Sequence, residues 1–338
     1  MKFQKCFVVD LDNTIYNWVD AFAPMFRAGV HALSKKSGIN ESTLLDSFRD
    51  LFNARGSLEY RVSSVRELPA LAGLNDAEVR VYENHFFGTL NKLWDKNIAL
   101  YPNVDKFLSA SFNNGWQLVA FTNAPMDVAL VRLNRLGIAG FFAAIVAPDH
   151  AISTVSYAQT LGQTRDLFDV SPMRTTHGFD VTHQAPHYQY RLQPNQMKPS
   201  SFGFQLIRDA FSVGSTLVVI GDNIAKDLAP AYATGSTVSI WARFGTNIQP
   251  KNLDTLLRVT PWTTKEITQS GVTSIHPDYI ADDWMDILRF ADADVFQATI
   301  DRHSDQPSQD PPKRARSSGT QTKLGFEPRV NRARFRQA

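Results

Sequence analysis

Residues 6–14 read CFVVDLDNT, and the interpretation of the whole chain starts from this stretch. Its first four residues form a continuous apolar run, which is typical of a strand buried on both faces, so we predict a strand over residues 3–10. Asp10 and Asp12 follow the run, and side chains two positions apart on a strand share a face. Two acidic groups at the end of a buried strand are costly unless a site uses them, although the pair alone also fits a solvated turn.

Further apolar runs alternate with helical segments such as residues 104–112 and 126–136. This alternation predicts an α/β fold, a parallel sheet with helices on both faces. The runs lie at residues 118–121, 144–146, 217–220 and 237–241.

A helical insertion separates the first two predicted strands. Apolar residues recur there at helical spacing, no strand pattern interrupts them, and Asn40 and Asn75 are suitable N-caps. The predicted helical stretches are residues 19–36, 41–53, 58–71 and 76–96.

Two later segments are irregular. Residues 148–197 are too long for an ordinary connection, and we expect a hairpin at 179–192. The histidines of this segment, His150, His177, His183 and His187, lack any accompanying cysteine, so we interpret them as surface residues rather than zinc ligands. The second segment, 244–274, has predicted helices near 252–258 and 264–269, and the chain returns to the core at 277–290.

The charge of the chain is uneven. The net charge is +2, but from Arg302 onward nine Lys and Arg face three Asp and Glu, so the positive charge belongs to the tail. The expected organisation is a core at residues 1–15 and 100–292, a helical insertion at 16–99, and a disordered basic tail at 303–338.

The composition is that of a globular protein, with 43% hydrophobic and 20% charged residues among 338. The single cysteine, Cys6, excludes an internal disulfide and fits a reducing compartment. We see no N-terminal signal and no apolar stretch of membrane-spanning length, so we expect a cytoplasmic protein with no membrane partner.

Three further features add chemistry to the acidic pair. Thr122 and Asn123 follow the second strand and offer a hydroxyl and a backbone amide to a phosphate oxygen. Lys198 precedes a helix that begins near residue 200 and supplies a positive charge. Residues 221–227 read GDNIAKD, in which two aspartates bring the oxygen ligands that Mg²⁺ prefers. Ligands bind open α/β sheets at these strand ends.

The order of these elements resembles the haloacid dehalogenase (HAD) superfamily. The resemblance rests on a DxDxT element, a threonine after the second strand, a lysine before a helix and a GDxxxxD element, and it covers about residues 1–290. It implies a Rossmann-like core with a helical cap of the C1 type after the first strand.

The resemblance also implies roles for the residues that match. Asp10 would be the nucleophile, and Asp12 the general acid and base. Asp10, Asp222 and the backbone carbonyl of Asp12 would hold Mg²⁺, with Asp227 holding the metal shell or orienting a ligand. Thr122, Asn123 and Lys198 would bind the phosphoryl oxygens. A phosphate dianion repels a carboxylate, so Mg²⁺ and the Lys198 ammonium must neutralise charge before Asp10 can attack.

Asp12 narrows the expected reaction. Superfamily members that cleave carbon–halogen bonds lack an aspartate at this position, so we expect an Mg²⁺-dependent phosphatase acting on a small phosphorylated metabolite. Phosphomutases keep both aspartates, so a phosphomutase or another phosphotransferase remains an alternative. Residues 10–16 together with 121–124 look closest to the pyrimidine 5′-nucleotidase-like branch, which implies a nucleoside monophosphate.

Two groups of residues stay open. Arg55, Tyr60, Arg61 and Arg66 are candidates for facing the pocket from the cap, against the simpler interpretation of a solvated helix face. In the tail, PPKRAR at 311–316 resembles a basic targeting or nucleic-acid-contact run, and QTKLGF at 321–326 resembles a replication-clamp-binding peptide. A protein that acts through this tail, on nucleic acid or a clamp, is the alternative from a different class.

Overall fold

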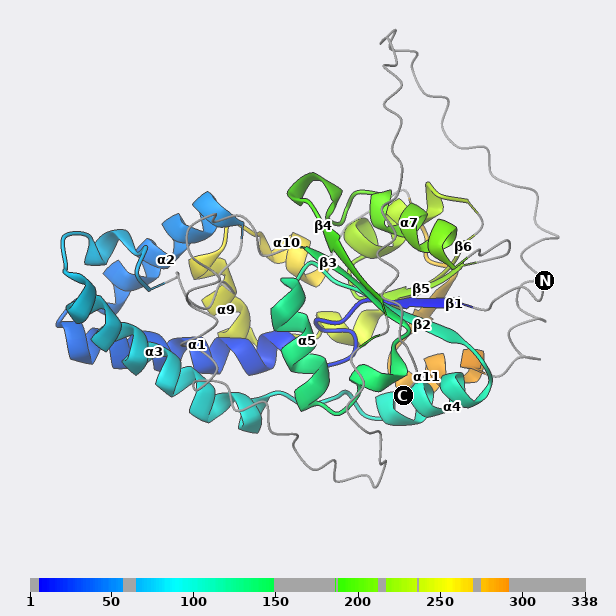
Figure 1. Cartoon of the computed structure of the whole chain (residues 1–338), viewed down its shortest axis with the longest axis horizontal. Helices are drawn as coiled ribbons and strands as arrows, with labels where there is room; N and C mark the ends of the chain where they lie inside the picture. The colour runs from blue at the N-terminus through cyan, green and yellow to red at the C-terminus, as the bar shows by residue number, and fades with distance from the viewer. Residues whose placement is uncertain are drawn as a thin grey trace, which may run out of the picture.

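The computed structural model describes residues 6–56, 65–148, 186, 188–211, 217–235, 237–269 and 275–291. Within these ranges, seven strands form one parallel sheet in the order β4-β3-β2-β1-β5-β6-β7 (Figure 1). The strands are β1 (Cys6–Val9), β2 (Gln117–Phe121), β3 (Ala144–Pro148), β4 (Tyr188–Leu192), β5 (Leu217–Gly221), β6 (Thr237–Ala242) and β7 (Tyr279–Ala281). Every predicted apolar run is a strand, so the predicted α/β, Rossmann-like fold is confirmed.

Helices cover both faces of the sheet. One buried apolar cluster packs α4 (Val104–Asn113), α5 (Met126–Arg135) and α11 (Trp284–Leu288) against one face. A second cluster packs α7 (Phe202–Ala210) and α8 (Ala229–Tyr232) against the other. The central strands are buried on both sides, which explains why their sequences are apolar throughout rather than alternating.

The strand order places β1 at the centre of the sheet, between β2 and β5. The chain leaves β1 toward β2 on one side and later returns to β5 on the other, so the order reverses at β1. Parallel sheets bind ligands beyond the carboxyl ends of the strands at such a reversal. The end of β1, where Asp10 follows Val9, therefore lies where a ligand site is expected.

The helical insertion lies between β1 and β2, as expected. It contains α1 (Trp18–Ser37), α2 (Glu41–Arg55) and α3 (Asp76–Asn97), which Figure 1 shows extending away from the sheet. Its own apolar core contains Phe48, whose ring centroid lies 5.4 Å from that of Phe86.

Both predicted N-caps of the insertion are confirmed. The Asn40 side chain accepts a hydrogen bond from Ser42 N at the start of α2. Asn75 accepts from the backbone at the start of α3 and forms a reciprocal capping box with Glu78. Each cap satisfies backbone donors that a helix start leaves without an intrahelical partner.

The predicted helix at 58–71 is wrong for the part that is described. Residues 65–71 contain turns and one short 3-10 helix, η1 (Pro69–Leu71). Pro69 disfavours the α conformation of the residue before it, and Leu68 is extended, with φ −63° and ψ 123°. An α-helix cannot run through this position.

The connection between β6 and β7 contributes to the same helical unit. Its helices α9 (Pro250–Val259) and α10 (Thr264–Thr268) match the two predicted there. Helix α9 packs against α1 and α2, with Leu256 and Val259 buried in the core of the insertion (Figure 1). Arg27 of α1 donates to the side chains of Thr255 and Asn252, at 2.7 and 3.0 Å.

Of the hairpin expected at 179–192, one strand is described, and residues 179–185 and 187 lie outside the described residues. Strand β4 pairs with β3 in parallel, with Ala144 opposite Tyr188, at the edge of the sheet. The four histidines of this segment and the basic tail lie outside the described residues. None of the helices in the described ranges combines the length and the apolar character that crossing a bilayer requires.

Candidate active site

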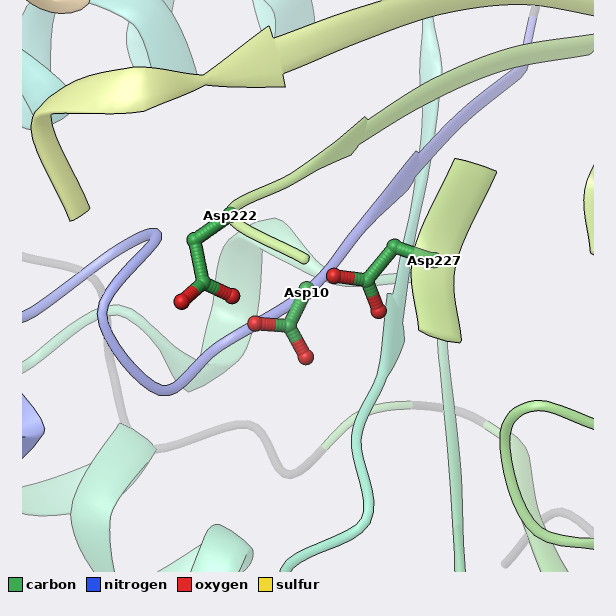
Figure 2. A group of neighbouring side chains, drawn as sticks. All are labelled: Asp10, Asp222 and Asp227. Atoms are coloured by element: carbon green, nitrogen blue, oxygen red, sulfur yellow. The ribbon is translucent and has the colours of Figure 1, made fainter. Parts of the chain in front are cut away.

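Three carboxylates converge at the carboxyl ends of two adjacent strands. Asp10 follows β1, and Asp222 follows β5 directly. Asp227 comes from the short π-helical segment η4 (Ile224–Leu228). Each offers one carboxylate oxygen to a group whose members lie within 4.8 Å of one another, and Figure 2 shows the side chains pointing toward a common space.

Gly221 allows Asp227 to reach this space. A Cβ at position 221 would lie 2.5 Å from the Cβ and from a carboxylate oxygen of Asp227. The glycine is therefore required by a close approach of side chain to backbone. The backbone amide of Asn223 donates to Asp227 Oδ2 at 3.0 Å and fixes the direction of that carboxylate.

Lys198 contributes a buried cation to the cluster. Its Nζ donates to Asp10 Oδ1 and Asp227 Oδ1, both at 2.6 Å, and to the carbonyl oxygen of Phe121 at 2.9 Å. The residue precedes α7, as predicted, and is only 7% exposed. A buried ammonium with three acceptors is satisfied, and it ties the ends of β1 and β2 to η4.

The carboxylates of the cluster are not fully neutralised by the ammonium of Lys198. Burial, together with the neighbouring Asp227 and Asp12, raises the pKa of Asp10 to about 7 despite the opposing effect of Lys198. Burial, then Asp10 and Asp227, also raise the pKa of Asp222 well above its ordinary value. Burial disfavours the ammonium of Lys198, but the carboxylates of Asp10 and Asp227 outweigh it and raise the pKa of Lys198. One lysine therefore does not neutralise three carboxylates.

The donor set fits a hard divalent cation. Three carboxylate oxygens within 4.8 Å of one another can share one ion, and oxygen ligands are those that Mg²⁺ prefers. A bound cation would supply the positive charge that Lys198 alone does not, and it would reverse the pKa shifts of Asp10 and Asp222.

Thr14 connects the two strand ends, a role that its motif did not reveal. Its hydroxyl donates to Asp10 Oδ2 at 3.1 Å and accepts from the backbone amide of Asp222 at 3.1 Å. Its carbonyl accepts from the indole of Trp284 at 2.9 Å. Thr14 is fully buried, and its hydroxyl bridges the Asp10 carboxylate and the backbone of Asp222.

The two residues after β2 have different surroundings. Thr122 is buried, and its Oγ1 accepts from the backbone amide of Ala124 at 3.0 Å. Asn123 was considered only for its backbone amide, but its side chain contacts Lys198. It donates to the carbonyl oxygen of Lys198 at 2.8 Å and accepts from the amide of Lys198 at 3.0 Å.

The carboxylate of Asp12 points to a partner outside the three-carboxylate group. Arg132 of α5 donates from Nη1 to Asp12 Oδ1 at 2.9 Å. Arg132 is 2% exposed, and nothing in its sequence position distinguishes it from the surface arginines of a helix. The pairing could not be predicted because it joins residues 120 positions apart.

Gly245 also approaches the site unexpectedly. It lies in η5 (Arg243–Thr246), after β6. A Cβ there would lie 2.0 Å from the carbonyl oxygen of Asn13 and 2.8 Å from Asp222 Cβ. The loop therefore packs directly on the two strand ends, and a glycine after the apolar run 237–241 was its only signal in the sequence.

The residues predicted to face the pocket from the insertion are not brought to this cluster where they are described. Arg66 pairs with Asp76 at 2.7 Å and lies 3.6 Å from Glu83, both on α3. Tyr60 and Arg61 lie outside the described residues, as does the side chain of Arg55.

No protein-family model matches the chain, and no curated protein matches it either. Solved structures resemble it at low identity. A 2-haloacid dehalogenase from Pseudomonas syringae pv. Tomato DC3000 is 18% identical, with a TM-score of 0.48, over 89% of this chain and 99% of that one. A HAD phosphatase from Thermococcus onnurineus is 14% identical, with a TM-score of 0.45, over 84% and 96% of the two chains.

A HAD-hydrolase from Bacillus subtilis, bound to magnesium, is also 14% identical, with a TM-score of 0.44, over 86% of this chain and 100% of that one. At these low identities the similar structures do not assign a chemistry to the site, which has to follow from the residues of this chain.

Proposed function

We propose that this chain is an Mg²⁺-dependent HAD-type phosphatase that hydrolyses a small phosphate monoester through an aspartyl-phosphate at Asp10. The observation that carries the proposal is the contact of Lys198 Nζ with both Asp10 and Asp227 at 2.6 Å, within a group of three carboxylates. A fixed cation beside a buried carboxylate, next to oxygen ligands for a second cation, is what attack on a dianionic phosphate requires.

In the first half-reaction, a carboxylate oxygen of Asp10 attacks phosphorus and the bond from phosphorus to the ester oxygen breaks. Asp12 gives its proton to the departing oxygen, so an alcohol leaves rather than an alkoxide. The ammonium of Lys198 and the hydroxyl of Thr122 stabilise the negative charge on the phosphoryl oxygens. Thr14 holds Asp10 in place through its 3.1 Å hydrogen bond.

In the second half-reaction, water attacks the phosphorus of the aspartyl-phosphate and gives a proton to Asp12. The bond from phosphorus to Asp10 breaks, which releases inorganic phosphate and restores both carboxylates. Asp10, Asp222 and Asp227, with the backbone carbonyl of Asp12, would hold the metal. Bound Mg²⁺ neutralises carboxylate and phosphate charge so that the two anions can approach.

The helical insertion would act as the cap that selects the substrate. It follows β1 directly, so a movement of the insertion would open or cover the end of that strand. Helix α9 packs on α1 and α2, and we propose that it belongs to this cap. A nucleoside 5′-monophosphate is the leading substrate class, on the resemblance of residues 10–16 and 121–124 to pyrimidine 5′-nucleotidases.

The test is a panel of phosphate monoesters, with nucleoside 5′-monophosphates and sugar phosphates among them, assayed for phosphate release in Mg²⁺ and in EDTA. We expect release that requires Mg²⁺ and is lost in Asp10→Asn. Unchanged release by Asp10→Asn would contradict the mechanism. Transfer of phosphate to a second hydroxyl without release would favour a phosphotransferase instead.

The basic tail gives a separate expectation. If the tail only recruits the enzyme to nucleic acid or to a clamp protein, deletion of residues 303–338 leaves the turnover of small esters unchanged. Loss of that turnover on deletion would assign the tail to the catalytic unit.

A further inference from the structure

Arg132 is a cation almost completely removed from water. It lies on α5, is 2% exposed, and donates from Nη1 to Asp12 Oδ1 at 2.9 Å. Burying a guanidinium is costly unless a carboxylate and further contacts compensate it. The pair therefore joins the segment after β1 firmly to a helix of the core.

Two aromatic rings lie close to the guanidinium. Its Cζ lies 5.2 Å from the ring centroid of Trp94 and 5.9 Å from that of Tyr16. Tyr16 belongs to the segment that leads from Asp12 into the helical insertion, and Trp94 lies near the end of α3, the helix that leads back. Cation–π contacts with both rings favour a defined position of the guanidinium near them.

The outgoing and returning segments of the insertion are joined at the same place. Asn13 N donates to the carbonyl oxygen of Tyr16 at 2.8 Å, and Tyr101 N donates to that of Ile15 at 3.0 Å. Arg132 thus contacts the residue assigned as acid and base together with the two points at which the insertion joins the core. A shift of the insertion would be transmitted to the guanidinium.

We propose that Arg132 is a positioning residue that sets the direction of the Asp12 carboxylate and couples it to the position of the helical insertion. The proposal rests on the proposed function, because it takes Asp12 as the proton donor to the leaving oxygen. A guanidinium is planar and fixes the plane of a carboxylate, whereas an ammonium fixes only a distance.

A positioning role predicts an effect that depends on the leaving group. An alkyl alcohol leaves only if its oxygen is protonated, whereas 4-nitrophenolate leaves without a proton. If Arg132 no longer orients the Asp12 carboxylate, protonation of the leaving oxygen becomes slower. The hydrolysis of alkyl phosphates should therefore slow more than that of 4-nitrophenyl phosphate. We expect Arg132→Met to lower kcat roughly 10- to 100-fold for the best alkyl ester of the panel, with KM little changed. With 4-nitrophenyl phosphate, kcat should stay within about threefold of the wild-type value.

Two further variants separate positioning from a structural role. Arg132→Lys keeps a cation near Asp12 but removes the planar guanidinium. It should therefore show a smaller fall in kcat, again selective for the alkyl ester, even where Arg132→Met folds poorly. Arg208→Met is the control: Arg208, on α7, donates to Thr234 and Thr237 at the opposite end of the sheet. It should leave both substrates at wild-type rates.

The deciding measurement is a double-mutant cycle with Asp12→Asn, using kcat for the alkyl ester. If Arg132 acts through Asp12, then Asp12→Asn/Arg132→Met is no slower than Asp12→Asn alone. Losses that multiply, or equal losses with both esters in Arg132→Met, would overturn the positioning role while the wild-type enzyme remains active. Failure of the proposed function looks different, because the wild type itself would then release no phosphate.

Discussion

Asn123 holds the backbone of Lys198 at both its N–H and its C=O, across 75 positions of sequence, with hydrogen bonds of 3.0 and 2.8 Å. A carboxamide is suited to this task because it carries one donor group and one acceptor in a fixed plane. The end of β2 thereby sets the place of the cation that contacts Asp10 and Asp227.

The Asn123–Lys198 contact predicts the effect of Asn123→Ala. The variant loses both hydrogen bonds, and Lys198 is then free to shift relative to Asp10. We expect kcat/KM for phosphate esters to fall about 10- to 100-fold, since small displacements of charged groups are costly. The Mg²⁺ concentration for half-maximal rate should stay unchanged, because the Asn123 side chain contacts the backbone of Lys198 and none of the carboxylates proposed to bind the metal. A tenfold rise in that concentration together with an unchanged rate would contradict the assignment.

Lys198→Met removes the cation and leaves its carboxylate partners in place. Catalysis should fall by about three orders of magnitude, since phosphate charge is no longer stabilised. In EDTA the free energy of unfolding should fall by about 3–5 kcal/mol, because Asp10 and Asp227 lose their buried partner. Kinetics and urea unfolding measure the two effects. Lys106→Met, at an exposed lysine that donates to Asn103, should change neither.

Gly245→Ala tests the packing of η5 on the strand ends. The new methyl group would meet the carbonyl oxygen of Asn13 and Cβ of Asp222, so the backbone must move. We expect apparent Mg²⁺ affinity to fall about tenfold, as for other residues that support metal ligands. Gly88→Ala is the matched control on α3, where a Cβ meets nothing within 4 Å. It should add about 0.5–1 kcal/mol of stability and leave Mg²⁺ affinity unchanged.

The carboxylate cluster predicts how stability depends on pH in EDTA. The pKa of Asp10 rises from 3.8 to about 7 on folding, and that of Asp222 is raised as well. The folded state therefore binds more protons than the unfolded state between these values. The contribution of the cluster to stability is fully present below pH 3.8 and is lost as the pH rises through about 7.

Thermal unfolding between pH 5 and 8 measures this dependence. The unfolding temperature in EDTA should fall more steeply with pH in the wild type than in Asp222→Asn, which removes one of the coupled carboxyl groups. Mg²⁺ should raise it more at pH 8 than at pH 6, because the metal needs ionised ligands. Identical slopes for the two proteins would show that the cluster does not titrate as described.

Most of the fold could be predicted from local patterns. Strands buried on both faces are continuous apolar runs, and the helix starts at Asn40 and Asn75 carry caps that act within a few residues. The pairing of segments that lie far apart in the chain leaves no such local pattern in the sequence. The parallel pairing of Tyr188–Leu192 with β3 was not predicted, because the partner of a strand is set by the topology of the whole sheet. The packing of α9 on α1 also had no local sign in the sequence.

The same distinction applies to the site. Asp10, Asp222 and Lys198 were identified because charged residues directly follow apolar strands or precede a helix, and the structure places them together. Arg132 and Gly245 were missed because an arginine in a helix and a glycine in a loop are ordinary in sequence. The structure shows their importance, because Arg132 Nη1 lies 2.9 Å from Asp12 Oδ1. A Cβ added at Gly245 would lie 2.8 Å from Asp222 Cβ.

The most direct test of Asp10 as the nucleophile is chemical trapping during turnover. Borohydride reduces an aspartyl-phosphate to homoserine, which mass spectrometry of the peptide containing residue 10 detects. We expect homoserine at position 10 in wild-type enzyme quenched with substrate and Mg²⁺, and none when EDTA replaces Mg²⁺. Homoserine or phosphate at a different residue, with Asp10→Asn turning over at the wild-type rate, would contradict it.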